Sequence, residues 1–123
     1  MTQPLALVFY ERLLPGTQLV NRLQDLGYRV KTVHAAEALA ATAETEKPLL
    51  VLADLECTKA NVCDVIAQLK KNPATGHLPV IAFAPEQRAE LQAAARAAGA
   101  VVTGESALLG QLPQLLDQAL QLE

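Results

Sequence analysis

Short apolar runs alternate with longer amphipathic or alanine-rich stretches along the whole chain. The most strongly apolar run covers residues 48–54, reads Pro-Leu-Leu-Val-Leu-Ala-Asp, and ends in a single carboxylate. A continuous apolar run of this length is typical of a strand that is buried on both faces of a parallel sheet. Open α/β sheets place their ligands at the carboxyl ends of the strands, so Asp54 is the first residue to consider for a function.

Four further strands are predicted around this central one. Apolar or alternating runs place them at residues 5–9, 28–33, 79–83 and 100–103. The segment 28–33 alternates polar and apolar positions, which is typical of a more exposed strand near a sheet edge.

Helices are predicted between the strands and after the last one. A loop is expected at Pro15 and Gly16, after which Thr17 caps a first helix that ends at Gly27. The other helices are expected at residues 35–47, from Asn61 or Asp64 to the loop at 72–77, at 86–98 and at 107–122. Five β–α units with short connections imply a three-layer αβα sandwich, because right-handed crossovers cover both faces of a parallel sheet.

Composition narrows the class of protein further. The chain of 123 residues has the length of one domain, over residues 1–123, and its 51% hydrophobic content is enough for a core. A net charge of −3 and a pI near 5.3 argue against a nucleic-acid surface, which needs a basic stripe. No run approaches the roughly 20 apolar residues of a membrane-spanning helix, and no signal-peptide pattern opens the chain. We therefore expect a cytoplasmic domain with neither nucleic acid nor membrane as a partner.

The cysteines and histidines do not form a recognisable metal or redox motif. Cys57 and Cys63 lack the spacing of a metal or redox pair, and His34 and His77 fall in different predicted loops. We interpret Cys57 as a loop thiol, Cys63 as a small helix residue and the histidines as surface residues.

Three stretches carry a more specific pattern. Asp54 is followed by a loop over 55–60 and a helix, residues 71–82 run from a polar loop into a strand, and Ala-Ala-Gly-Ala at 97–100 precedes the last strand. In these stretches the chain resembles the receiver domain of bacterial response regulators, the CheY-like phosphoacceptor module of two-component and phosphorelay signalling. The resemblance covers nearly the whole chain. It implies a flavodoxin-like fold with a five-stranded parallel sheet in the order 2-1-3-4-5 and five helices.

The resemblance also implies a phosphoacceptor pocket. A receiver needs a nucleophilic carboxylate, acids that hold Mg²⁺, a hydroxyl and a lysine, because three phosphoryl oxygens must be held beside an already negative nucleophile. Asp54 matches the nucleophile. Glu11 matches one acid, and Glu56 is a further candidate Mg²⁺ ligand beside Asp54. Tyr10 stands where the second acid of the pair would be.

Three other positions of this implied pocket lack the expected chemistry. The switch hydroxyl maps to Ala84, the lysine to Ser106 and the switch aromatic residue to Thr103. A partly buried phosphoaspartate without a cation is poorly compensated. The sequence therefore predicts a degenerate receiver, or pseudo-receiver, in which Asp54 is a phosphoacceptor or an acid that caps the following turn.

Two functions remain open. The first is a stand-alone, non-enzymatic signalling module that binds a histidine kinase, another signalling protein, or a second copy of itself through the face of strand five and the leucine-rich last helix. The second is a small flavodoxin-like enzyme or flavin electron carrier on the same fold. The loop at 11–17 is poor in the Gly, Ser and Thr that cradle a phosphate, and Phe83 is the aromatic residue nearest a later strand end.

Overall fold

The computed structural model describes residues 4–10, 13–33, 36–55, 62–73, 75–76 and 78–121. Within helices, it describes the backbone but not the side chains at 13–16, 36–37, 105–106, 109 and 119–121.

Five parallel strands form one sheet in the order β2-β1-β3-β4-β5. The strands are β1 (Leu5–Phe9), β2 (Arg29–Val33), β3 (Leu50–Asp54), β4 (Val80–Ala84) and β5 (Val101–Gly104). All five residues of β3 and of β4 are buried, whereas three of the five in β2 are exposed. The predicted strand order, the buried central strand and the exposed edge strand are therefore confirmed.

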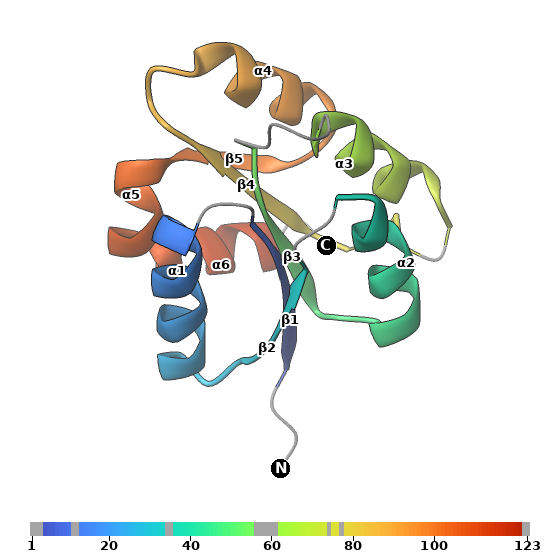
Figure 1. Cartoon of the computed structure of the whole chain (residues 1–123), viewed down its shortest axis with the longest axis horizontal. Helices are drawn as coiled ribbons and strands as arrows, with labels where there is room; N and C mark the ends of the chain where they lie inside the picture. Colours follow the sequence, from blue (N-terminus) through green and yellow to red (C-terminus); the bar gives the residue numbers. More distant parts are fainter. Residues whose placement is uncertain are drawn as a thin grey trace.

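Helices cover both faces of this sheet (Figure 1). They are α1 (Leu13–Asp25), α2 (Ala36–Glu46), α3 (Val62–Lys71), α4 (Ala89–Ala97), α5 (Glu105–Gly110) and α6 (Leu112–Gln121). Helices α1, α5 and α6 pack on one face, and α2, α3 and α4 pack on the other. The predicted αβα sandwich is confirmed.

Two core clusters lie on opposite faces of the sheet, because successive strand residues point to opposite sides. The α1-side core consists of Ala6, Val8, Tyr10, Leu19, Leu23, Leu50, Leu52, Ile81, Phe83, Leu108, Leu112, Leu115 and Leu116. The α3-side core consists of Leu7, Phe9, Val33, Leu39, Ala43, Val51, Ala53, Leu55, Val62, Cys63, Ile66, Leu69, Leu78, Val80, Ala82, Ala84, Ala95 and Ala100. Leucine, valine and alanine side chains thus make up most of both cores.

The first helix starts earlier than predicted. Helix α1 begins at Leu13 and includes Pro15 and Gly16, so the expected loop there and the cap at Thr17 are wrong. Proline is accepted at this point because the first N–H groups of a helix have no intrahelical partner. The predicted end is confirmed, since Gly27 has a φ of 93°, a left-handed conformation that favours glycine.

The end of the chain forms two helical segments where one continuous helix over 107–122 is expected. Helix α5 begins at Glu105 and ends at Gly110, and α6 starts at Leu112. In an unbroken helix the ring of Pro113 would clash with the carbonyl four residues earlier. A new start at Leu112 places this proline in a first turn, where its missing N–H costs no hydrogen bond.

Helix α4, which precedes β5, starts later than residue 86, where the sequence predicts its beginning. Residues 85–88 form a turn in which the Arg88 N–H donates to the Pro85 carbonyl at 2.9 Å, and α4 begins at Ala89. The turn directs the chain away from the end of β4 before the helix forms.

Candidate functional site

The carboxyl ends of the strands bring the predicted pocket positions to one edge of the sheet. Phe9 of β1 pairs with Ala53 of β3, so Tyr10 follows at the level of Asp54. Asp54 in turn pairs with Phe83, and Phe83 pairs with Thr103 of β5. Four residues that are far apart in the sequence are therefore neighbours across the sheet: Tyr10, Asp54, Phe83 and Thr103.

Asp54 is completely buried at this edge. Its exposed fraction is 0%, and it is one of two buried polar residues in the described part of the chain, the other being Thr75. The side chain has interaction partners, and no buried side-chain oxygen or nitrogen of the described residues lacks a hydrogen bond. Asp54 continues the alternation of Leu50 and Leu52, which places its carboxylate on the α1-side face.

Tyr10 lies beside Asp54 on the same face. It is 6% exposed and belongs to the α1-side core, and its backbone N–H donates to the Val33 carbonyl at 3.2 Å. A phenol side chain therefore lies directly after β1, at the position where the resemblance implies an acid.

Ala84 and Thr103 have the limited chemistry that the sequence indicates. Ala84 is fully buried in the α3-side core. Thr103 is half-buried, and its hydroxyl donates to the Gly104 carbonyl at 3.3 Å. Ser106 falls in α5, but its side chain lies outside the described part of the structure.

Two further residues at this edge were not predicted. The side chain of Glu86, in the turn after β4, packs directly over Gly104 at the end of β5. The Gln92 side-chain amide of α4 donates to the Pro85 carbonyl at 3.3 Å. The glycine at 104 leaves room for this contact, since a Cβ there would require the end of the Glu86 side chain to shift.

Several predicted residues lie outside the described part of the structure. They are Glu11, Glu56, Cys57, His34 and His77. Among the described residues, no group of three or more histidine, cysteine or acidic side chains is placed to hold a metal ion.

Cys63 is a core thiol, as the sequence indicates. It is buried in the α3-side core, and its Sγ lies 3.8 Å from the Leu91 carbonyl of α4. Burial raises the pKa of this thiol, and the nearby Asp64 carboxylate raises the pKa further. A raised pKa lowers the fraction of thiolate, which is the form that reacts.

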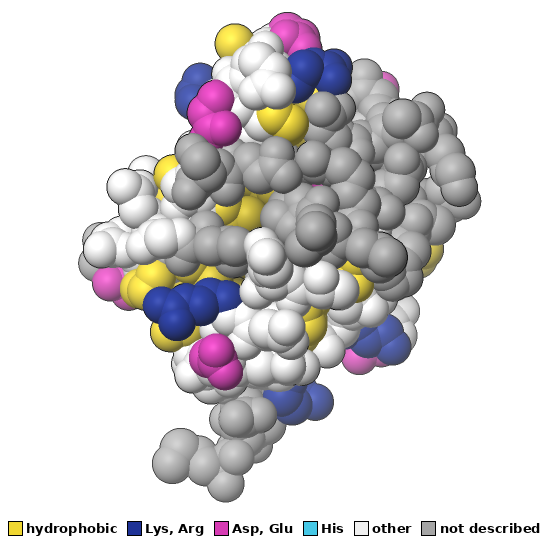
Figure 2. Space-filling view, turned by 60° about the vertical axis from the view of Figure 1, so that its left-hand side comes forward, with side chains coloured by type: hydrophobic (Ala, Val, Ile, Leu, Met, Phe, Trp, Pro, Cys, Tyr) yellow, Lys and Arg dark blue, Asp and Glu magenta, His cyan; other side chains and the backbone are white. Residues whose placement is uncertain are grey.

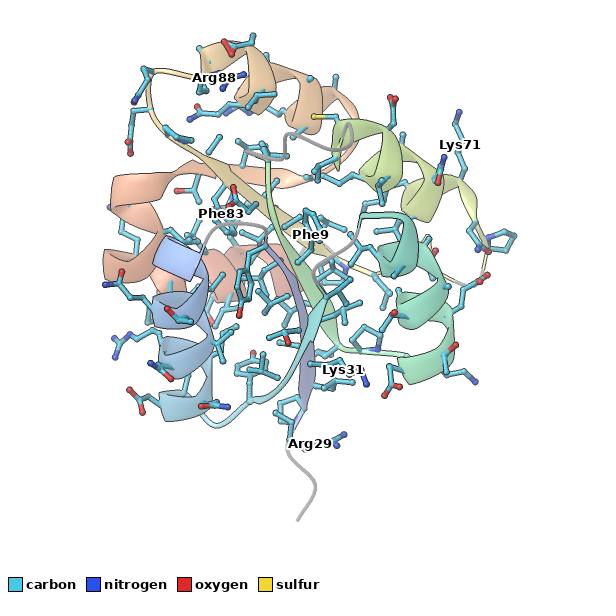
Figure 3. The ribbon with its side chains drawn as sticks, in the orientation of Figure 1. Phe9, Arg29, Lys31, Lys71, Phe83 and Arg88 are labelled. Carbon is cyan, nitrogen blue, oxygen red and sulfur yellow. The ribbon has the colours of Figure 1, made fainter. Side chains whose placement is uncertain are left out.

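Two observations bear on the nucleic-acid and flavin alternatives. On the face shown in Figure 2, the Lys and Arg side chains are interspersed with acidic ones and form no continuous basic stripe. Phe83 is 0% exposed, so its ring is not available to stack on a flavin. Figure 3 shows Phe9 and Phe83 within the molecule, and these rings belong to the cores on opposite faces of the sheet. No helix among the described residues is long and apolar enough to cross a membrane.

The leucines of the last two helices are mainly core residues. Leu108, Leu112, Leu115 and Leu116 are all buried in the α1-side core. The side chains of Leu109, Leu120 and Leu122 lie outside the described residues. A homodimer through β5 and the last helix stays a prediction.

Comparisons with known proteins place the fold. No family model matches the chain, and no curated protein matches it in sequence. The receiver domain of the sensor histidine kinase PA1611 from Pseudomonas aeruginosa, described with magnesium in its active-site cleft, is 16% identical with a TM-score of 0.86, over 98% of this chain and 99% of that one. A response regulator from Desulfuromonas acetoxidans is 22% identical with a TM-score of 0.79, over 98% of each chain. The chemotaxis response regulator CheY4 of Vibrio cholerae is 18% identical with a TM-score of 0.77, over 93% of this chain and 99% of that one.

These similarities establish the architecture. The chain has the CheY-like, flavodoxin-like fold of response regulator receiver domains, as the sequence predicts. At such identities the likeness concerns the fold, and the function must be argued from the site.

Proposed function

We propose that this protein is a receiver-like signalling module that acts by contacts with other proteins and does not depend on phosphorylation of Asp54. The observation that carries the proposal is the composition of the strand-end edge. Of the four residues Tyr10, Asp54, Ala84 and Thr103, only Asp54 has a carboxyl group, and it is fully buried. The receiver-like fold is retained, and at three of these four positions the side chain lacks the chemistry that the resemblance implies.

Electrostatics explains why this edge is a poor phosphoacceptor. A phosphoryl group on Asp54 would add negative charge at a point that water does not reach. Compensation requires cations or hydrogen-bond donors aimed at the phosphoryl oxygens. The position of the lysine is taken by Ser106 and that of the hydroxyl by Ala84.

The usual signal route from such a pocket is also changed. In place of a hydroxyl and an aromatic residue that move together, this chain has Ala84 and Thr103, and the Thr103 hydroxyl is bonded to its own strand. Nothing at these two positions would report the state of Asp54 to β5 and its neighbouring helices. Output by constitutive binding is the simplest use of the fold.

The proposed partner is a histidine kinase or another signalling protein, by analogy with receiver domains of this fold. The mixed charge on the face shown in Figure 2 suits a protein partner better than nucleic acid. We place this activity in the cytoplasm, and assign no catalytic role to the chain.

The test is a comparison of partner capture by the native protein and by Asp54→Asn. Each tagged protein is incubated with lysate of the source cells, bound proteins are identified by mass spectrometry, and the affinity of the purified partner is measured calorimetrically. We expect a histidine kinase or a response regulator with the same affinity for both proteins. Asp25→Asn, an exposed acid at the other end of α1, is the matched control.

Two results would overturn this proposal. Binding that is lost in Asp54→Asn and retained in Asp25→Asn would identify a phosphorylation-dependent receiver. Capture that yields no signalling protein with either variant would remove the signalling function itself.

A further inference from the structure

The fold raises the question of whether a divalent cation fits beside Asp54. One structural neighbour is described with magnesium in its active-site cleft. Among the described residues at the equivalent edge, Tyr10 places a phenol where the resemblance implies one carboxylate of an acidic pair, and Glu11, the other position of that pair, lies outside the described residues. We propose that Tyr10 closes the Asp54 pocket against divalent cations. The inference rests on the proposed function, since it names the residue that makes the pocket inactive.

The strand register places the two side chains together. Val8 of β1 pairs with Leu52 of β3, and both residues belong to the α1-side core. Two positions further along each strand lie Tyr10 and Asp54, which therefore share the same face and the same edge. Both side chains are withdrawn from solvent, with exposed fractions of 6% and 0%.

The chemistry of the ring opposes cation binding. Mg²⁺ requires oxygen ligands in near-octahedral geometry and keeps several of its waters. A phenol packed among apolar residues supplies no carboxylate to the ion, and its ring lies on the same face and at the same edge as Asp54. Tyr10 is held there by its burial and by its backbone hydrogen bond to Val33.

The hydrogen bonding of Asp54 also opposes cation binding. Its carboxylate is already satisfied by partners within the molecule. A cation would have to compete with those partners for the carboxylate oxygens. Tyr10 and the hydrogen bonds of Asp54 within the molecule therefore both oppose cation binding in the pocket.

Amide NMR of the labelled protein tests the inference directly. Magnesium chloride is titrated to millimolar concentrations into the native protein, Tyr10→Asp, Tyr10→Phe and Tyr10→Asp with Asp54→Asn. We expect no saturable shifts at the ends of β1 and β3 in the native protein or in Tyr10→Phe, which keeps the ring. Tyr10→Asp should gain saturable shifts and bind at least about tenfold more tightly, because a second carboxylate faces the ion. The double variant should lose this gain.

A second readout guards against a variant that fails to fold. Tyr10→Ser removes the ring without adding a charge. Magnesium binding is interpreted only for variants whose amide spectrum has the dispersion of a folded protein. In a Tyr28→Phe background Tyr10 is the remaining tyrosine of a chain without tryptophan, so its fluorescence reports whether magnesium disturbs the ring.

Three outcomes would overturn the inference. They are saturable magnesium shifts around Asp54 in the native protein, a magnesium-dependent change of Tyr10 fluorescence, or a folded Tyr10→Asp protein that gains no binding. None of them bears on partner capture, so failure of this inference is distinguishable from failure of the proposed function.

Discussion

Lys70 connects three separate segments with one side chain. Its Nζ donates to the Leu78 carbonyl at 2.8 Å, and its methylene carbons pack against Gly99 at the turn between α4 and β5. We predict that Lys70→Met, which keeps the apolar stem, lowers the free energy of unfolding by about 1–2 kcal/mol through loss of this hydrogen bond. Urea denaturation measures the change. Lys71→Met is the matched control, because this neighbouring side chain is exposed and its loss should cost less than about 0.5 kcal/mol. Equal effects of the two changes would contradict this role of Lys70.

Cys63 allows a pH-dependent prediction at the same scale. Burial, followed by the Asp64 carboxylate, raises the pKa of its thiol, so the thiolate forms in the unfolded chain at a lower pH than in the folded one. The stability that this difference contributes is present below the pKa of the unfolded thiol and is lost as the pH rises through the higher folded value. In a Cys57→Ser background, alkylation of Cys63 should be slow in the native protein and fast in denaturant. Rapid alkylation under native conditions at neutral pH would show that the thiol is accessible.

Two glycines at the ends of helices should respond differently to the same substitution. Gly27 ends α1 with a φ of 93° and has no neighbouring atom that a Cβ would meet, so its requirement is purely conformational. We predict that Gly27→Ala lowers the free energy of unfolding by about 1–2 kcal/mol. Gly110, at the end of α5, also has open space around it but no positive φ. There alanine should be neutral or stabilising by up to about 1 kcal/mol, because glycine is the poorer helix former. Thermal or urea unfolding of both variants checks the difference, and a comparable loss at both positions would refute it.

The element bounds show what sequence patterns can and cannot give. The strands and the end of α1 at Gly27 follow from local apolar runs and from glycine, and these predictions are confirmed within a residue or two. Two of the three errors at helices involve a proline inside a helix. Pro15 lies inside α1 and Pro113 inside α6, each in a first turn. The sequence pattern treats Pro15 as the sign of a loop and passes over Pro113 within a continuous helix. The cost of each proline depends on where the helix starts, which tertiary packing decides.

At the scale of the whole molecule, the topology brings distant residues together at one edge of the sheet. The sequence predicts only part of the chemistry of that edge. The resemblance identifies Asp54 as the acid at the end of the central strand, and the register brings Tyr10 and Thr103 to the same edge. The complete burial of Asp54 could not be predicted, because it depends on side chains from other strands and helices. The contact of Glu86 with Gly104 likewise joins a turn to a strand end and has no local signature beyond the glycine.

The two cores share one sheet, and this arrangement predicts how the molecule unfolds. Leu52 faces the α1-side core and Val51 the α3-side core from adjacent positions of β3, so neither layer can be lost while the other keeps its strands. We expect a single cooperative transition in urea. Tyr28 packs against the α1-side core and Cys63 lies in the α3-side core, so tyrosine fluorescence in a Tyr10→Phe background and thiol labelling in a Cys57→Ser background report on opposite faces. Their midpoints should coincide, and Leu52→Ala should shift both together by about 2–5 kcal/mol. Separate midpoints, or a shift confined to the fluorescence, would show that the two layers unfold independently.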